Sequence, residues 1–523
     1  MKRKISALVL IAVMLIAAMG CGKGSDNNNE TTSDTTVANE KEETYPAEAG
    51  GEVTAAGKPE MVRVVVNGTI FTEENGRDEF EKELEEALGL DVVFEQQAHT
   101  GYADAVLDIF VSGEWPDVVL LSAEQYAKYV EMGVLWDMTE AYDNADFQSR
   151  LVSDINEDLK INGVLYGFSP NRGNGCVTYV KKAWMDAVGI TSLPTTWGEY
   201  YDMLLKFTNE DPDGNGVNDT YGVSAARLIG EEAPYTNFLP EFYQDAYPDF
   251  LMDESGVWYD GFDTEAMTAA LGRLQQGYQD GVIDPETLTQ GTGDVRNKFY
   301  ADTFGAFSYW AGTWNSNIIN GLTARGLSGE LEILAPLEET GYFLERQTYV
   351  WAITTACENP EGVFEYFLEP MLDGGEVQFL WTYGAKGTHW NDIAETVAAG
   401  NKEYTYEEGE FHMLPSPENS ETLLSRNHLD PLLVIAHLSE EYTVETADEA
   451  MVSSSQYFME HAVSAPLPAG SELVNKYSSE LWSIKREVIQ QVVVQNKDVE
   501  EWMQYYRDNT DAMTAEILAQ LNE

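Results

Sequence analysis

The fold class follows from residues 62–95, which read VRVVVNGTIFTEENGRDEFEKELEEALGLDVVFE. The β-branched run at 62–66 predicts one strand, and 91–95 predicts a second. Between them, residues 77–88 have helical periodicity, with Gly89 as the C-terminal stop. The apolar face of this helix carries Phe80, Leu84, Ala87 and Leu88. Strand, helix and strand in so short a stretch predict a right-handed crossover unit of a parallel sheet.

The same alternation continues further along the chain. Residues 103–112 predict a helix, Trp115-Pro116-Asp117 breaks it, and 118–121 predicts a buried strand. The chain is therefore expected to be an α/β protein. Ligands of open α/β sheets bind at the carboxyl ends of the strands, so loops 67–72 and 122–125 are candidate binding loops. The alternative is that both loops are only polar turns.

The N-terminus has the features of a secretory signal. Basic residues at positions 2–4 precede an apolar run at 5–19, and small residues surround the end of that run at Cys21. The Ala-Met-Gly-Cys ending at 18–21 resembles the bacterial lipobox, in which the cysteine is lipidated and the chain is cut before it. This predicts a signal peptide at 1–20 and a lipid anchor on Cys21, on the extracellular face of the cell membrane. The alternative is an ordinary signal with an incidental cysteine.

A polar segment separates the anchor from the folded part. Residues 21–60 are rich in Gly, Ser, Asn, Thr and Glu and are expected to form a disordered tether. The remaining 61–523 is longer than one typical domain, which predicts two or more domains.

The charge balance excludes one class of partner. Lys and Arg total 30 against 90 Asp and Glu, for a formal net charge of −60. A nucleic acid requires a positive surface, so no nucleic-acid partner is expected, and contact with the membrane is expected through the anchor alone. Apart from Cys21, the chain has Cys176 and Cys357, which either pair in an oxidising compartment or remain two core thiols.

Residues 211–219, DPDGNGVND, have the spacing of a calcium loop. Oxygen-bearing side chains stand at positions 1, 3, 5 and 9, glycine at position 6, and a carbonyl is available at position 7. The candidate ligands are Asp211, Asp213, Asn215, Val217 and Asp219. Position 12 is Gly222 instead of glutamate, so the remaining oxygens must come from elsewhere. The predicted cofactor is a structural calcium ion, and the alternative is a metal-free turn.

Six short segments resemble, in order and spacing, the bacterial extracellular solute-binding proteins (family 1) that serve as substrate-binding lipoproteins of carbohydrate ABC importers. They are 112–118 (SGEWPDV), 133–139 (GVLWDMT), 163–167 (GVLYG), 178–184 (TYVKKAW), 194–199 (PTTWGE) and 281–286 (GVIDPE). Thr196 and Glu199 in the fifth segment also predict a helix capping box.

The resemblance implies a two-lobed periplasmic-binding-protein-like fold with discontinuous lobes and a hinge. The N-terminal lobe is expected to comprise 61–174 and 351–430, and the C-terminal lobe 175–350 and 431–523. The implied function is capture of a carbohydrate, expected to be an oligosaccharide, by a monomer that delivers it to permease subunits. No enzymatic activity is implied.

Two aromatic clusters and one polar loop are the candidate ligand contacts. Residues 309–315 (YWAGTWN) resemble a sugar-stacking segment of the family, and 381–390 resembles a second one, expected to be a binding loop because its composition is unusual for a helix. Indole rings pack on the CH-rich faces of pyranoses. The candidates are Trp310, Trp314, Trp381, Tyr383, Trp390, Asn171 and Arg172. For any single Trp, core packing is the alternative.

Two other functions remain open. A secreted glycoside hydrolase needs a carboxylate pair, and a chain this rich in Asp and Glu always offers one. A binding protein for peptides or another solute would have the same overall pattern.

Overall fold

The computed structural model describes residues 57–67, 76–98, 101–153, 155–226, 228, 238–253, 255–392, 411–413, 429–442, 449–465 and 471–522. They belong to one compact unit, Thr54–Glu523. The predicted signal peptide, Cys21, the tether as far as residue 56 and the loop after Asn67 lie outside the described residues.

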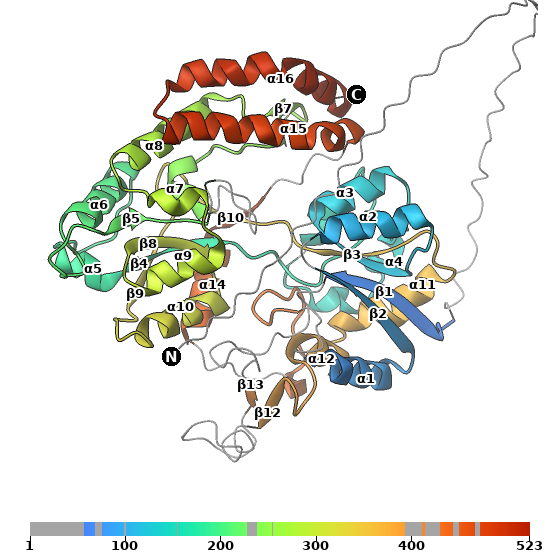
Figure 1. Cartoon of the computed structure of the whole chain (residues 1–523). Coiled ribbons are helices and arrows are strands. Elements are labelled where there is room, and N and C mark those ends of the chain that lie inside the picture. The colour runs from blue at the N-terminus through green and yellow to red at the C-terminus, as the bar shows by residue number, and fades with distance from the viewer. Residues whose placement is uncertain are drawn as a thin grey trace, which may run out of the picture. The chain divides into compact units, whose positions relative to one another are not determined.

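The N-terminal lobe is built on a four-stranded sheet with the order β11-β3-β1-β2 (Figure 1). Its strands are β1 (Met61–Asn67), β2 (Asp91–Gln97), β3 (Val118–Leu121) and β11 (Val350–Ile353). β1 pairs in parallel with β2 and β3, whereas β11 is antiparallel to β3. The predicted crossover unit is therefore confirmed, and a strand distant in sequence completes the sheet.

Helices pack on this sheet and fill its core. They are α1 (Arg77–Leu88), α2 (Tyr102–Ser112), α3 (Ala123–Glu131), α4 (Thr139–Asp143), α11 (Pro360–Val363) and α12 (Glu376–Tyr383). Gly89 takes a φ of 64° where α1 ends, which explains the glycine stop. One buried hydrophobic cluster joins residues from Val62–Phe168, Val350–Trp381 and Leu429–Ala436.

The C-terminal lobe has a second four-stranded sheet with the order β5-β8-β4-β9 (Figure 1). Its strands are β4 (Cys176–Lys181), β5 (Tyr221–Val223), β8 (Phe304–Trp310) and β9 (Leu331–Leu334). β5 and β8 run parallel, and β4 is antiparallel to both β8 and β9.

The helices of this lobe are α5 (Lys182–Ala187), α6 (Trp197–Asn209), α7 (Pro240–Tyr243), α8 (Glu265–Gln279), α9 (Thr292–Tyr300), α10 (Thr313–Thr323), α14 (Glu449–His461), α15 (Glu472–Ile489) and α16 (Val499–Leu521). Thr196 caps α6 by accepting the N–H of Glu199, and the Glu199 carboxylate accepts from the N–H of Thr195. In Figure 1, α15 and α16 lie side by side next to β7.

The remaining strands form three two-stranded sheets. They are β6 (Phe250–Met252) with β7 (Trp258–Asp260), β10 (Phe343–Glu345) with β14 (Ala462–Ser464), and β12 (Trp390–Asp392) with β13 (Phe411–Met413). A second hydrophobic cluster joins residues from Cys176–Phe343 with Phe458 and with Val488–Tyr506. The lobe boundaries near 175, 350 and 430 stay predictions.

The two cysteines of the described chain are both buried, and no disulfide joins them. Cys176 belongs to the C-terminal cluster and Cys357 to the N-terminal cluster. Burial raises the pKa of the Cys357 thiol to about 12. Of the two alternatives left by the sequence, the structure therefore has two core thiols and not a disulfide.

Candidate ligand-binding site

The parallel strands β5 and β8 are neighbours, and β5 ends at Val223 opposite Ala306, four residues before β8 ends at Trp310. Four short segments follow these strands or begin the helices after them. We call these segments the strand-end region: residues 224–226 after β5, 311–312 after β8, 290–296 at the start of α9, and 313–316 at the start of α10. Gln290 joins the first and third segments, because its Nε2 donates to the Ser224 hydroxyl at 2.6 Å and to the Ala225 carbonyl at 3.0 Å. Carboxyl ends of strands in open α/β sheets are where ligands bind.

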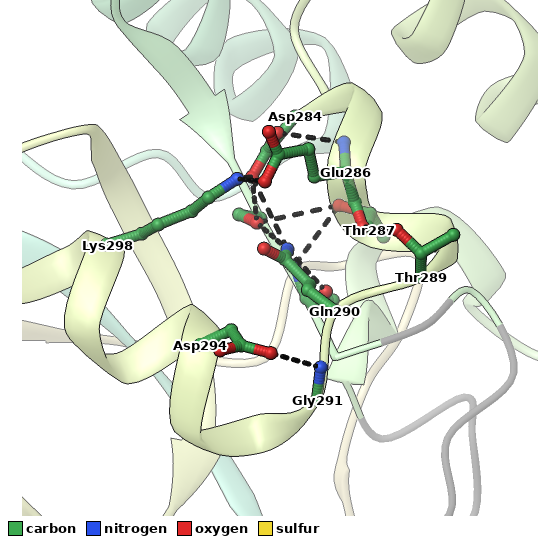
Figure 2. Close-up of polar contacts among 10 residues, drawn as sticks. Asp284, Glu286, Thr287, Thr289, Gln290, Gly291, Asp294 and Lys298 are labelled. Atoms are coloured by element: carbon green, nitrogen blue, oxygen red, sulfur yellow. Dashed lines mark hydrogen bonds and ion pairs between the residues drawn. The ribbon is translucent and has the colours of Figure 1, made fainter. Parts of the chain in front are cut away.

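Asp284 anchors the β5 side of this region (Figure 2). Its carboxylate is 1% exposed and accepts from the Ser224 hydroxyl at 2.8 Å, from Lys298 Nζ at 2.7 Å and from the backbone N–H of Glu286 at 3.0 Å. Lys298 also pairs with Glu286 at 2.8 Å. Burial opposes the charge of Lys298, but the two carboxylates outweigh it and raise the pKa of Lys298. The contacts are structural, because each of the three charged groups has a partner within the network.

The β8 side carries the aromatic group. Trp314 is half-buried in the first turn of α10, and its ring meets that of Tyr309 edge-on, with centroids 5.1 Å apart. Arg296 of α9 donates through Nη1 to the Tyr309 hydroxyl at 2.6 Å. Its guanidinium carbon lies 4.5 Å from the Trp314 ring centroid. Aromatic rings and a fork of donors are thus combined at one strand end.

Three acceptors in the strand-end region have no hydrogen-bond partner among the described residues. They are Oε1 of Gln290, Oδ1 of Asn315 and Oγ of Ser316. Gln290 and Asn315 are only 5% and 6% exposed. A buried acceptor without a donor is costly, and water or a ligand hydroxyl relieves that cost.

The ring of Trp310, the last residue of β8, is less exposed to a ligand than the ring of Trp314. It is 6% exposed, its carbonyl accepts from the Tyr179 hydroxyl, and the Arg346 guanidinium lies 4.7 Å from its ring centroid. A ring so enclosed leaves little surface for a sugar, which favours the core alternative for this Trp.

The expectation of a binding loop at 381–390 is wrong for its first part. Trp381 and Tyr383 lie in the last turn of α12, which begins at Glu376, and Gly384 ends it with a φ of 78°. Trp381 is 0% exposed and packs edge-on against Phe80 and Trp351. Apolar residues before Trp381 form a helical face together with it. The aromatic cluster taken alone, from residue 381 onward, does not contain those residues and so did not predict the helix.

Tyr383 and Trp390 pack around Phe379. Tyr383 is buried, with its ring centroid 4.9 Å from that of Phe379, and Trp390 is half-buried, 5.5 Å from the same ring. The Trp390 indole N–H donates to the Gly384 carbonyl at 3.0 Å. Of the second cluster, Trp390 therefore keeps the most accessible ring.

Asn171 and Arg172 lie shortly before β4, a strand of the C-terminal sheet. Asn171 forms a β-bridge with Val434, and the Arg172 backbone N–H donates to the Leu433 carbonyl at 2.8 Å. The Arg172 guanidinium donates to both carboxylate oxygens of Glu345, at 3.3 and 2.5 Å, and Glu345 is 4% exposed. The guanidinium that the sequence predicted to bind a ligand is bound to the buried Glu345 carboxylate. Arg172 therefore holds its own segment to the segment that contains Glu345.

The neighbouring connections touch through their backbones. The Arg346 N–H donates to the Asn174 carbonyl at 3.1 Å. Gly173 is buried, and a Cβ on it would overlap the Arg346 carbonyl oxygen. Residues 171–174 and 345–348 therefore form one packed pair, which we call the paired connection.

In the N-terminal lobe, residues 122–125 cap a helix. Ser122 and Gln125 form a reciprocal capping box at the start of α3. Glu124 is exposed, but surrounding protein and the negative charge of Asp249 in the C-terminal lobe raise the pKa of its carboxyl.

The predicted calcium loop forms a turn in which its polar side chains bond to one another. The Asn215 amide donates to Asp213 at 2.7 Å and to Asp219 at 3.1 Å, and Asp211 accepts the Gly216 N–H at 3.0 Å. Burial, together with Asp211 and Asp219, raises the pKa of Asp213. Gly216 takes a φ of 82°. In the part of the chain that the structure describes, no group of three or more His, Cys, Asp or Glu is arranged to hold a metal ion.

The sequence reasoning missed Arg296, Gln290 and Asn315. Arg296 lies on an ordinary amphipathic helix, and its partner Trp314 comes 18 positions later, so no local spacing signals the contact. The sequence did place Trp314 after a strand end, and the structure adds Arg296 to it. Asn315 follows Trp314 in α10, and Gln290 bonds to the residues after β5.

The chain matches a family described as bacterial extracellular solute-binding protein over residues 77–368, more than half of its length. It belongs to the bacterial extracellular solute-binding proteins. Among curated relatives, the lipoprotein LipO of Bacillus subtilis is 25% identical over 211 residues, which cover 39% of this chain and 41% of LipO. The polygalacturonan/rhamnogalacturonan-binding protein YtcQ of B. subtilis is 22% identical over 370 residues, covering 64% of this chain and 68% of YtcQ.

Solved structures with the same fold include a solute-binding protein from Bifidobacterium longum infantis that binds HMO (TM-score 0.62, 14% identity, 89% of this chain and 98% of that one). The alginate-binding protein AlgQ2, solved without calcium ion, has a TM-score of 0.60 at 16% identity, with coverage of 89% and 98%. These likenesses establish the two-lobed fold. No helix in the described ranges is long and apolar enough to cross a membrane.

Proposed function

We propose that this solute-binding protein captures a carbohydrate, expected to be an oligosaccharide, and delivers it to the permease subunits of an ABC importer. The observation that carries the proposal is the half-buried Trp314 with Tyr309 at the carboxyl end of β8, next to hydrogen-bonding groups. Sugars offer the matching chemistry, since apolar ring faces pack on aromatic side chains while peripheral hydroxyls bond to polar groups. The ligands of YtcQ and AlgQ2 are saccharides, which supports this class.

Within the site, we assign stacking to Trp314 and hydroxyl binding to Gln290 and Asn315, whose acceptors have no partner in the described chain. Trp390 remains a secondary candidate. Trp310, Trp381 and Tyr383 are assigned to packing, because each is buried, and Arg172 to the paired connection.

A thermal-shift screen against oligosaccharides and peptides tests the proposal. A ligand that binds only the folded state raises the melting temperature, by about 2.7 kcal/mol of stability at a hundred times its Kd. We expect one or more oligosaccharides to do so, and no peptide. The bound sugar should be recovered chemically unchanged after long incubation. Shortened sugar would favour a glycoside hydrolase, and a response to peptides alone would replace carbohydrate as the ligand class.

We also propose a structural calcium ion in the loop 211–219. The oxygen spacing supports it, as do the mutual proximity of Asp211, Asp213 and Asp219 and the mention of calcium for AlgQ2. Asp211, Asp213, Asn215, the Val217 carbonyl and Asp219 would hold the ion. Its role would be to neutralise the carboxylates and fix the turn.

We further propose that the mature chain begins at Cys21 and is held at the outer face of the cell membrane by lipid on that residue. The basic, apolar and small-residue pattern of 1–21 supports this. The lipoprotein name of LipO is consistent with it. The receptor would act as a monomer.

A further inference from the structure

Arg296 is the feature of the strand-end region that a neutral sugar leaves unexplained. Its guanidinium lies against the Trp314 ring and donates one hydrogen bond, to the Tyr309 hydroxyl. Among the described residues it has no ion pair with a carboxylate.

The nearby carboxylates are already committed to other partners. Asp284 and Glu286 both pair with Lys298, which lies two residues after Arg296 on α9 (Figure 2). Asp294 accepts the backbone N–H of Gly291 at 3.0 Å, as Figure 2 also shows. The local network thus satisfies its own acids without using Arg296.

Three other arginines of the same lobe have a backbone carbonyl or a carboxylate as their partner. Arg273 donates to the Phe242 and Tyr243 carbonyls, Arg507 pairs with Asp263 at 2.7 Å, and Arg325 donates to the Gly321 carbonyl while stacking on Tyr300. Arg296, like Arg325, combines a stacked guanidinium with one hydrogen bond, but its partner is a side-chain hydroxyl at a strand end. Guanidinium has five donors in a planar fork that matches a carboxylate, so the described residues leave most of its donors without a partner.

We infer that Arg296 binds a carboxylate of the ligand, and that the ligand is an acidic saccharide containing uronic acid. This inference rests on the proposed saccharide function. The carboxylate of a uronic acid projects from the edge of the pyranose ring. A sugar whose face packs on the open part of the aromatic pair presents that edge to the guanidinium, which lies over the Trp314 ring. The acceptors of Gln290 and Asn315, which have no partner among the described residues, suit other hydroxyls of the ligand.

The test compares matched sugars on the full mature receptor. Trigalacturonate and trimannuronate are each titrated beside the same trisaccharide with its carboxylates masked as methyl esters, and beside neutral trisaccharides. We expect an acidic form to bind about 10- to 100-fold more tightly than its ester, the range for a charge-assisted hydrogen bond. Arg296→Gln should remove that preference, and Arg296→Lys should restore part of it.

Arg325→Gln is the matched control, because it removes another stacked arginine of the same lobe. It should leave the preference intact, and melting temperatures verify that every variant is folded. Equal affinity for acid and ester overturns the inference. So does tight binding of a neutral saccharide that Arg296→Gln leaves unchanged, although the proposed function then stands. If neither acidic nor neutral saccharides bind, the proposed function itself fails.

Discussion

Trp314 and Trp381 look alike in the sequence, because each stands in an aromatic, glycine-containing cluster. The structure separates them by burial: Trp381 is 0% exposed in the N-terminal core, whereas Trp314 is half-buried beside Tyr309. Burial depends on which distant residues pack around a ring, and a local sequence pattern does not contain that information. The sequence therefore predicted the type of contact and one of its positions, but not which rings belong to the core.

Trp314→Ala should weaken saccharide binding with a smaller effect on folding. Loss of a stacking ring costs about 1–3 kcal/mol, which is roughly tenfold or more in affinity. Trp381→Ala is the contrasting variant, since removing a core Trp costs about 3–5 kcal/mol of stability. Calorimetric titration and thermal melting of both variants measure the two effects. Undiminished affinity in Trp314→Ala would move the stacking role to Trp390.

Glu241 gives a prediction about pH. It is 4% exposed in α7 and accepts a hydrogen bond from Thr178 at 2.5 Å. Burial raises the pKa of its carboxyl from 4.5 to about 7. The folded state therefore holds a proton that the unfolded state releases, and the free energy of unfolding falls as the pH rises from about 4.5 to 7, by about 3 kcal/mol at most.

Glu241→Gln should remove this dependence, because an amide does not ionise. The melting temperature of the variant minus that of the natural protein should rise steadily as the pH rises from 4.5 to 7.5. Glu199→Gln serves as the control, since backbone and side-chain hydrogen bonds from Thr195 lower the pKa of the exposed Glu199. Parallel curves for Glu241→Gln and the natural protein would show that Glu241 is charged in the folded state.

At the scale of elements, local signals were sufficient where a motif is self-contained. Helix α1 begins and ends at the predicted residues, and β3 spans the predicted 118–121. Periodicity and a glycine stop determine such elements within a few turns. β11 could not be assigned to its sheet in this way, because its antiparallel partner β3 lies more than 200 residues earlier.

The loop 211–219 leads to a prediction about metal removal. Chelation should lower the melting temperature, and added calcium should restore it, because a ligand of the folded state stabilises by mass action. Asp213→Ala should abolish the calcium response. Asp253→Ala removes a carboxylate that also organises a tight turn, through the N–H groups of Ser255 and Val257, and should leave the response unchanged. Melting that is insensitive to chelator and calcium would identify the loop as a metal-free turn.

At the scale of the whole molecule, the order of six short segments predicted the family and the two-lobed fold, while the residues between them were uninformative. The described structure begins after the predicted anchor, so a cellular experiment must test attachment. Cys21→Ser should release the protein into the medium or leave the signal uncut, because serine provides no thiol for lipidation. Fractionation and N-terminal sequencing measure this, with the buried Cys176→Ser as a control that should stay attached. Retention of a correctly cut Cys21→Ser protein would contradict the anchor.

The paired connection has a consequence for how tightly the receptor holds a ligand. Gly173 lets one segment lie directly against the Arg346 carbonyl, so a methyl group there acts as a wedge. If unliganded receptor already samples a minor closed population, the wedge alters that population without touching the ligand, and apparent affinity changes in proportion. Gly173→Ala should therefore shift affinity with every sugar contact intact. Gly272→Ala, which adds a methyl group in open space, should have no such effect. Small-angle scattering with and without sugar would measure the shift in the closed population. The affinity of the receptor could then be changed at a glycine that does not contact the ligand.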